Sequence, residues 1–582
     1  MANYFTDNED IQFLFDHLDL AELARIQEDD FTRDRNSEYA PVDAADAVDN
    51  YRRVLEIIGE VAGEMIAPNA ETVDREGNTL NPDGTVTLHP LVQQNLDRLT
   101  QADTMGFTLP RKYGGLNCPT TIYTMATEMI SRADCSLMNM FGLQGIAETI
   151  YAFADDELRD YILPQFANGK VTGAMVLTEP DAGSDLQAVR LRAYQAEDGQ
   201  WYLNGVKRFI TNGCGEVLLV LARSEPDIHD GRGLSLFYAE RDERVKVRHL
   251  EEKLGIHGSP TCELVFNDLP CKLIGERQRG LITYVMALMN GARVGIAAQS
   301  LGVAEAAYRL ARTYAHTRQQ FGGPIERLPA VAELVTDMRI DLEAGRALAY
   351  ETARVCDREN NNLRRLELDN ADLDKDEKKE RKQLSRALKR MNGMLTPMAK
   401  YYCSEMCIRV ADKAIQVLGG SGYMKDYAAE RHLRDSRITT IYEGTSQLQV
   451  VAAVRGVTSG AFETWTSDYD TRDFGDPELN AMRDRLVDAK AQIMEAIAFI
   501  KKQGGSYLDL SGRRLVESAM DVIIGYLFVD QARNNERKRK VAQRFLRRQL
   551  PMIRTNCEVI QSGDTMPLDD YAELAGPVPV AD

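Results

Sequence analysis

One carboxylate, Glu443, lies between Tyr442 and Gly444 in the sequence Arg-Ile-Thr-Thr-Ile-Tyr-Glu-Gly-Thr-Ser-Gln that begins at Arg437. A carboxylate can act as a general base when it is placed within reach of an acidic proton. An arbitrary Glu is more often an exposed surface residue or a partner of a helix N-cap. Glu443 is therefore a candidate base only if other residues indicate a substrate and a cofactor beside it.

Two polar segments could bind such a cofactor. Residues 178–185, Thr-Glu-Pro-Asp-Ala-Gly-Ser-Asp, follow the apolar segment 174–177 and offer hydroxyl and backbone donors to a phosphate or a heterocycle. A capped turn without a ligand explains them equally well. Residues 209–213, Phe-Ile-Thr-Asn-Gly, place an aromatic ring beside a hydroxyl, which could cover a planar ring and bond its edge. Strands often end in Asn-Gly, so this segment alone is weak evidence.

Two glycine-containing segments follow expected helices. Residues 317–322 read Thr-Arg-Gln-Gln-Phe-Gly, and residues 416–423 read Gln-Val-Leu-Gly-Gly-Ser-Gly-Tyr. A glycine at a helix C-terminus is the ordinary structural explanation. Three glycines within four positions exceed what a cap needs, and they suggest a close approach of the backbone to a ligand.

The elements that must position these residues change in type along the chain. Residues 1–165 are predicted to be mainly helical, because apolar residues return at helical spacing. Residues 166–280 contain short segments rich in β-branched and aromatic residues, with a hairpin expected at Asp198-Gly199. Residues 281–456 and 457–582 are again predicted to be helical. This order indicates an α+β architecture of four domains rather than alternating βαβ units, and there is no GxGxxG or GxxxxGK[ST] loop.

Composition narrows the class of protein. The 582 residues are too many for one compact core, and the formal net charge of −19 disfavours nucleic acid and anionic membranes as partners. The acidic N-terminus lacks the features of a signal peptide, and no transmembrane helix is expected, so a cytoplasmic location is predicted. The nine cysteines are expected to be reduced and mostly buried rather than metal-binding. The charged residues 357–390 are interpreted as a solvated helical extension or loop, with a docking surface as the alternative.

The motifs, in this order and at these separations, resemble the acyl-CoA dehydrogenase family over residues 50–455. The resemblance is carried by LTEPDAGSD, FITNG, KLGIHGSPTCELVF, TRQQFG, QVLGGSGYMKDYAAERHLRDSRI and IYEGTSQ. The N-terminal segment FLFDHLDL and the extra C-terminal residues are similar to an extended bacterial branch, which includes the 3-methylthiopropanoyl-CoA dehydrogenases. The implied fold has an N-terminal helical domain, a middle β domain, a helical bundle and an extra C-terminal helical domain.

The resemblance implies FAD between the β domain and the helical bundle. Phe209 would stack near the flavin, and Thr211 would bond the flavin N5, which accepts the hydride. Arg318 and residues 416–420 resemble segments that reach the FAD of a neighbouring subunit, so a homodimer or homotetramer is implied. Leu328-Pro329 stands where the family often has His-Gln, so one usual contact with FAD departs from the pattern. The cofactor-binding residues carried over are Met175, Leu177, Thr178, Gly183, Ser184, Phe209, Thr211, Arg318, Gln416, Gly419, Gly420, Thr445 and Gln447.

The resemblance also implies the substrate contacts and the base. Arg293 matches an arginine on the CoA-thioester side of the site, and Asn290 stands where members often have Asp. Some members carry the catalytic Glu just before the matching arginine, where this chain has Gly291-Ala292, so Glu443 is the family-type candidate. The substrate-binding residues carried over are Ser184, Asn290, Arg293 and Gly444.

The implied reaction is the FAD-dependent α,β-dehydrogenation of an acyl-CoA thioester to the 2-enoyl-CoA, with electrons passed to electron transfer flavoprotein. Glu443 would take the α-proton. An acyl-CoA oxidase of the same fold is one alternative. A DNA-associated flavoprotein of the same fold is another, supported slightly by the basic run 533–548, although the intact Glu443 argues against it. The acyl group is not readable from the residues.

Overall fold

The computed structural model describes residues 2–32, 37, 39–142, 144–368 and 373–579. The chain divides into two compact units, one formed by residues 1–382 and 399–446 and the other by residues 383–398 and 447–582.

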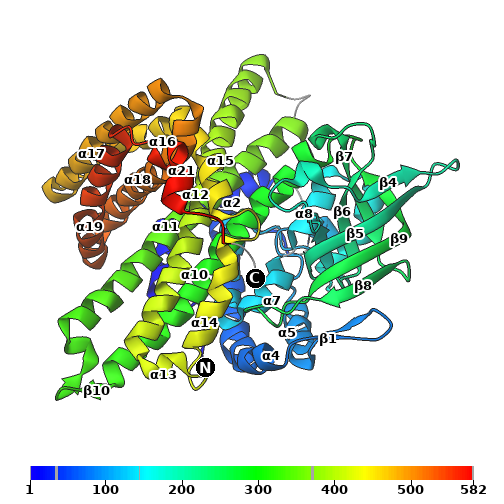
Figure 1. The fold of residues 1–582 in the computed structure, drawn as a ribbon, viewed down its shortest axis with the longest axis horizontal. Coiled ribbons are helices and arrows are strands. Elements are labelled where there is room, and N and C mark those ends of the chain that lie inside the picture. Colours follow the sequence, from blue (N-terminus) through cyan, green and yellow to red (C-terminus); the bar gives the residue numbers. More distant parts are fainter. Residues whose placement is uncertain (1, 33–36, 38, 143, 369–372, 580–582) are drawn as a thin grey trace. The chain divides into compact units, whose positions relative to one another are not determined.

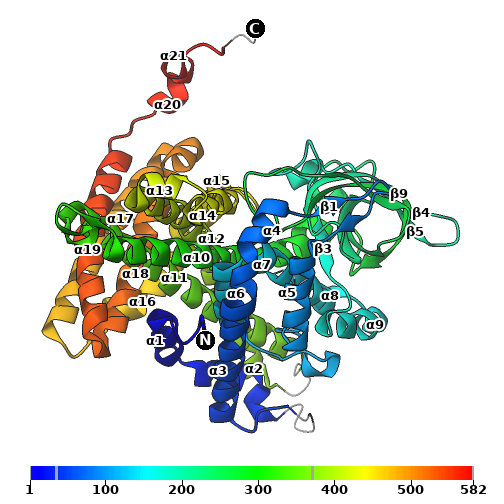
Figure 2. The ribbon, with the colours of Figure 1, turned by 90° about the horizontal axis from the view of Figure 1, so that it is seen from below.

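The N-terminal part of the first unit is helical, as its sequence predicts (Figure 2). Helix α1 begins at a polar cap, where the Asn8 side chain accepts from the backbone N–H groups of Asp10 and Ile11. A short hairpin, β1 (Thr79–Leu80) and β2 (Val86–Thr87), lies between α4 and α5. The helices are α1 (Glu9–His17), α2 (Leu20–Gln27), α3 (Ala44–Glu60), α4 (Ala70–Glu76), α5 (Pro90–Gln101), α6 (Thr120–Ala133), α7 (Cys135–Gly142), α8 (Gln144–Phe153) and α9 (Asp156–Ala167).

A seven-stranded sheet follows (Figure 1). Strand β6 pairs with β3, β4 and β7, and β7 also pairs with β9, so the pairings β6-β4-β5-β9-β7-β6 close into a ring. The expected hairpin at Asp198-Gly199 joins β4 to β5, with Gln195 opposite Trp201 and Gly199 at φ 87°. The strands are β3 (Gly173–Val176), β4 (Arg192–Gln195), β5 (Trp201–Thr211), β6 (Val217–Arg223), β7 (Leu234–Glu240), β8 (Val245–Leu250) and β9 (Thr261–Ile274).

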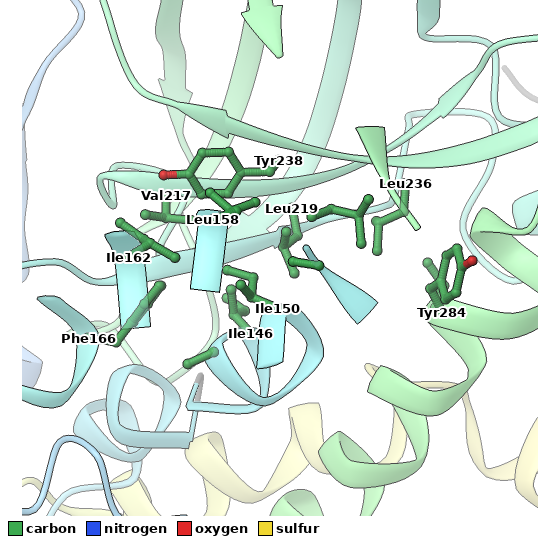
Figure 3. Packing of buried hydrophobic residues seen from close by; sticks show 14 of the residues in the cluster. Ile146, Ile150, Leu158, Ile162, Phe166, Val217, Leu219, Leu236, Tyr238 and Tyr284 are labelled. Atoms are coloured by element: carbon green, nitrogen blue, oxygen red, sulfur yellow. The ribbon is translucent and has the colours of Figure 1, made fainter. Parts of the chain in front are cut away.

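The uninterrupted apolar sequence of β6 reflects burial on both faces. Leu218 and Val220 face the interior of the closed sheet, where they pack with side chains such as Phe237. Their neighbours Val217 and Leu219 point the other way, against α8 and α9. Figure 3 shows this outer layer, in which side chains of the two helices meet the sheet. Its labelled members are Ile146, Ile150, Leu158, Ile162, Phe166, Val217, Leu219, Leu236, Tyr238 and Tyr284.

Long helices complete the first unit. Helix α10 (Met286–Thr317) packs against α6 and against α11 (Pro329–Leu368). It is preceded by η7 (Gly280–Val285) and followed by the small hairpin of β10 (Gln319–Gln320) and β11 (Gly323–Pro324). Helix α12 (Lys375–Leu418) contributes residues to both units, and α13 (Gly420–Tyr423) and α14 (Ala429–Ser436) follow it. Within the charged segment 357–390, residues 357–368 lie on α11 and residues 375–390 on α12, with 373–374 before α12 and 369–372 outside the described residues.

One described stretch, residues 280–317, is long and apolar enough by composition to cross a membrane. No such helix is expected from the sequence, and this one contains buried polar side chains. Gln299 donates to the Cys135 carbonyl at 3.0 Å, Ser300 donates to the Ile296 carbonyl at 2.8 Å, and both side chains are fully buried. A core helix of a soluble protein passes the same test, so the composition is weak evidence for a membrane span.

A buried cluster of charges joins four helices of the first unit. The guanidinium of Arg346 on α11 donates to Asp10 on α1 at 2.5 Å, to Glu128 on α6 at 2.5 Å and to Glu305 on α10 at 2.9 Å. All four side chains are almost completely buried. Because each ion has an opposite charge and a hydrogen bond, the cluster fixes how these helices pack around α10.

The second unit is helical and is built mainly on three long helices that pack against one another. Helix α17 begins at the Asp476 cap with Pro477 in its first turn and ends at Gly504, whose φ is 99°. The apolar run at 519–529 lies on α18, and every residue of this run is buried. The helices are α15 (Ser446–Thr458), α16 (Ala461–Asp470), α17 (Pro477–Gln503), α18 (Gly505–Gln531), α19 (Glu536–Gln561), α20 (Met566–Asp569) and α21 (Tyr571–Ala575).

The basic run 533–548 lies largely on α19, where some of its cations are occupied within the second unit. Arg539 pairs with Asp476 at 2.8 Å and with Glu478 at 3.1 Å, and Lys538 is buried. These contacts favour a structural role for that part of the run over a role in binding DNA.

Candidate active site

Glu443 lies in a tight turn between the 3-10 helix η9 (Arg437–Thr440) and α15. Its φ is 53° and that of Gly444 is 92°, so two successive residues occupy the left-handed region. This conformation is uncommon for a residue with a side chain, and such strain is concentrated at functional sites. Part of Glu443 is accessible, while its carboxylate lies deep enough for burial to raise the pKa.

Two cations oppose that effect of burial on Glu443. The positive charges of Lys400 and Arg293 lower the pKa of the carboxyl group, although the net direction remains upward. A carboxylate with a raised pKa is a stronger proton acceptor, which is the property a general base needs.

Arg293, on α10, is buried and incompletely bonded. Its Nη1 donates to Asn290 Oδ1 at 3.1 Å, one turn earlier on the same helix. Its Nε finds no hydrogen-bond partner among the described residues. A buried guanidinium N–H without a partner is suited to donate a hydrogen bond to an acceptor atom of a ligand. The structure brings together four of the expected residues, since Arg293 bonds Asn290 and interacts electrostatically with Glu443, which precedes Gly444.

The turn is anchored by residues that sequence reasoning missed. Lys400 on α12 is fully buried, and its Nζ donates to the Gly444 carbonyl at 2.8 Å. The Tyr442 hydroxyl bonds Gln299 on α10 and lies 3.4 Å from Asn139 Oδ1 on α7. From the sequence, Lys400 could have been singled out because it is a lone cation within an otherwise apolar segment of helix.

A second group of expected residues gathers on the sheet. The loop after β3 is fixed by Glu179, whose carboxylate accepts from the backbone N–H groups of Arg190 and Leu191 at 2.8 Å each. Beyond this anchor, Gly183 and Ser184 are exposed, whereas Met175 and Thr178 are half-buried and Leu177 is buried. The exposed part of the loop is therefore accessible to a ligand, while the bonds that Glu179 accepts hold the loop in place.

Phe209 lies in an irregularity of β5. The register between β5 and β9 shifts between Lys207 and Ile210, and Phe209 has a φ of 61° with about half of its surface exposed, 51%. Bulges of this kind redirect a side chain and are frequent beside active sites. Thr211, two residues later, is half-buried at the end of the strand, opposite Thr261 of β9.

Asn139 connects the sheet to the Glu443 turn. Its amide donates to Ser259 Oγ at 3.2 Å, two residues before β9 begins at Thr261, the partner of Thr211. Its carbonyl oxygen lies within 3.4 Å of the Tyr442 hydroxyl. The segment that leads into β9 and the Glu443 turn are thus bonded to the same side chain.

A third group lies where α10 and α12 end. Arg318 follows α10, and Gln416, Gly419 and Gly420 lie at the end of α12 and the start of α13; all four are exposed. Tyr314, one turn before Arg318, contacts Ser421 Oγ at 3.4 Å, which brings the two segments together. Of the remaining expected residues, Thr445 follows Gly444 in the turn, and Gln447 is an exposed residue of the second unit.

Family models of acyl-CoA dehydrogenases match most of the chain. The N-terminal, middle and C-terminal domains of acyl-CoA dehydrogenases match residues 49–170, 174–269 and 279–372 with 378–458, and a further acyl-CoA dehydrogenase C-terminal domain matches 458–562. An acyl-CoA dehydrogenase of Bacillus subtilis is 33% identical over 401 residues, which cover 68% of this chain and 94% of the relative.

Two further proteins are similar to this chain, one in sequence and one in structure. A 3-methylmercaptopropionyl-CoA dehydrogenase of Ruegeria pomeroyi is 33% identical over 433 residues, covering 69% of each protein. The structure of an acyl-CoA dehydrogenase complexed with FAD from Bacillus anthracis has a TM-score of 0.73 at 23% identity and covers 92% of both chains, so the fold is alike through the C-terminal helices. These findings confirm the resemblance, the fold and the enzyme class expected from the sequence. The chain belongs to the acyl-CoA dehydrogenase family.

Proposed function

We propose that this chain oxidises an acyl-CoA thioester to the 2-enoyl-CoA, with Glu443 as the base that removes the α-proton. The observation that carries the proposal is the Glu443 turn, which holds a buried carboxylate of raised pKa beside the unsatisfied Nε of Arg293. A proton next to a thioester carbonyl is weakly acidic, so its removal requires a well-placed base and stabilisation of the developing negative charge.

The residues present fit FAD, on which the family depends. Phe209 leaves about half of its surface exposed at the bulge of β5, 51%, and Gly183 and Ser184 are exposed on the loop after β3. At Gly419 and Gly420 an added Cβ would meet no atom within 4 Å, so a ligand could lie directly on the backbone. Bound there, FAD supplies the acceptor of the β-hydride.

The proposed division of labour follows from these positions. Met175, Leu177 and Thr178 would orient the flavin from β3 and its loop, and Thr211 would bond its edge. Thr445 and Gln447 would bind the nucleotide part. The CoA thioester would contact Arg293, Asn290, Ser184 and the backbone of Gly444. Glu443 would face the α-carbon of the thioester.

The test is anaerobic bleaching of the flavin absorbance after mixing with acyl-CoA. We expect Glu443→Gln to fold, to retain FAD and to reduce the flavin roughly 10²–10⁴-fold more slowly than the unchanged protein, the factor that a positioned base typically provides. Glu252→Gln, which changes an exposed carboxylate, serves as the control and should reduce flavin normally. Near-normal bleaching by Glu443→Gln would refute the assignment.

The acyl group is identified by the same measurement across a panel of thioesters. The panel should contain straight, branched and thioether-containing chains, since one relative bears the name 3-methylmercaptopropionyl-CoA dehydrogenase. The substrate is the thioester with the highest second-order rate constant for flavin reduction.

The electron acceptor and the assembly are also part of the proposal. We expect the reduced protein to pass electrons to electron transfer flavoprotein and to form little peroxide in air, whereas an acyl-CoA oxidase would form one peroxide per substrate. The exposed Arg318, Gln416 and Gly420 are proposed to reach the FAD of a second copy of the chain. Light scattering should therefore give a homodimer or a homotetramer.

A further inference from the structure

Lys400 lies directly beneath the Glu443 turn. Its side chain is fully buried on α12, and its immediate neighbours Ala399, Tyr401 and Tyr402 are buried as well. Its ammonium donates to the Gly444 carbonyl at 2.8 Å. A buried ammonium is unfavourable unless it is paired or bonded, so a lysine at this position requires a specific reason.

Helix α12 holds the turn at two points. Lys400 bonds the Gly444 carbonyl, and Glu405 accepts from the Ser446 hydroxyl at 2.6 Å. On the opposite side of Glu443, Tyr442 is bonded to Gln299. The residues that flank Glu443 are thus fixed on both sides, which stabilises its left-handed conformation.

The charged and titratable groups around Lys400 come from three elements. Glu443 belongs to the turn, Arg293 to α10 and Glu405 to α12 itself, and the Tyr442 hydroxyl also interacts with Glu443. Arg293 repels the ammonium, while Glu443 and Glu405 attract it.

We propose that Lys400 is a positioning residue for Glu443, which fixes the carbonyl of Gly444 through its N–H donor and favours the carboxylate form of the base through its charge. The inference rests on the proposed role of Glu443. It goes beyond that role because it names the residue through which the fold sets both the geometry and the proton affinity of the base.

The sign of the pH effect follows from the charges. Burial raises the pKa of Glu443, and Lys400 lowers it. Removing the ammonium should therefore raise the pKa of Glu443 and move the acid limb of flavin reduction to higher pH. An opposite charge at short range typically changes a carboxyl pKa by about 1–3 units. Burial lowers the pKa of Lys400 to about 7, so its charge, like that of Glu443, depends on the pH and on the other group.

Three variants separate the charge of Lys400 from its hydrogen bond. Lys400→Gln keeps a donor without charge, Lys400→Met removes both, and Lys400→Arg keeps the charge. Lys538→Met serves as the matched control, because it removes another buried ammonium, from a helix of the second unit that carries none of the proposed site residues.

The assay is anaerobic stopped-flow reduction of the FAD-loaded proteins between pH 6 and 9. We expect Lys400→Gln and Lys400→Met to shift the acid limb upward by about one pH unit or more, with Lys400→Met also slower, by about tenfold, at the pH of maximal rate. Lys400→Arg and Lys538→Met should keep the wild-type limb. If Lys400→Met loses FAD, Lys400→Gln carries the test alone.

An unchanged acid limb in Lys400→Gln would overturn the inference, as would an equal shift in Lys400→Arg. These outcomes are distinct from a failure of the proposed function. If Glu443→Gln abolishes reduction while the Lys400 variants keep the wild-type pH profile, only the role of Lys400 is wrong. If Glu443→Gln still reduces flavin, the base itself has been misassigned.

Discussion

His257 should stabilise the first unit in a pH-dependent way. It lies in the segment between β8 and β9, and both of its ring nitrogens face oxygen acceptors. Nδ1 lies 2.8 Å from the backbone oxygen of Asp74 and 3.0 Å from its carboxylate, and Nε2 lies 2.8 Å from the Lys253 carbonyl. An imidazole can donate from both nitrogens only when it is protonated, so this geometry favours the charged form.

The magnitude follows from the pKa of His257. The hydrogen bond to Asp74 raises it to about 9 from the ordinary 6.5, against the opposing effect of burial. A difference of about 2.5 units at 1.36 kcal/mol each gives an upper bound of about 3.4 kcal/mol. The imidazole keeps 32% of its surface exposed, and solvent screening reduces the expected contribution to roughly 1–2 kcal/mol.

The direction of the pH effect is fixed by the raised pKa. The folded state binds the proton more tightly than the unfolded state, so the stabilisation is complete below about pH 6.5. It is lost as the pH rises through about 9, where the folded state releases the proton. Replacing His257 by Gln should remove the contribution at every pH.

Urea unfolding followed by circular dichroism between pH 6 and 10 measures this contribution. We expect a gap of roughly 1–2 kcal/mol between wild type and His257→Gln at pH 6 that closes by pH 10. His249→Gln, which changes a half-exposed imidazole on β8, is the control and should show a gap near zero throughout. A gap for His257→Gln that is constant or grows with pH would refute the reasoning.

Two further changes test the packing and the backbone. Arg346→Met leaves the three buried carboxylates of its cluster without their guanidinium, and we expect a loss of about 3–5 kcal/mol in unfolding free energy. Arg358→Met removes a partly exposed ion pair, in which Arg358 Nε lies 3.6 Å from Glu22 Oε1. By urea titration, this change should lower the unfolding free energy by less than about 1 kcal/mol. Gly419→Ala should destabilise the FAD-free protein by roughly 1–3 kcal/mol, because its φ of 61° and ψ of −139° fall in a backbone region that favours glycine. Gly420→Ala, where φ is not in the left-handed region, should leave that stability unchanged.

The order of elements was predictable because it depends on local periodicity. The segments rich in β-branched and aromatic residues that indicated strands within 166–280 correspond to β3–β9, and the Asp198-Gly199 turn is found where it was expected. The continuous apolar sequence of β6 fits a strand that is buried on both faces and has no polar side.

The contacts that fix the candidate base were not predictable in this way. Lys400 bonds a residue 44 positions later, and Tyr442 is anchored to side chains 143 and 303 positions earlier. No local pattern reports such separations. The bulge at Phe209 was equally hidden, because a register shift between β5 and β9 depends on the partner strand rather than on the sequence of β5 alone.

The conformation of Glu443 explains why so many distant residues meet at one turn. A non-glycine residue in the left-handed region costs about 1–2 kcal/mol, and a buried ammonium at Lys400 adds a further unfavourable contribution. A fold selected for stability alone would lose nothing by placing glycine at position 443 and an apolar residue at position 400. The chain instead keeps both costs and offsets them with bonds from α7, α10 and α12. These costs are explained if the surrounding helices serve to fix the position and the ionisation of the Glu443 carboxylate.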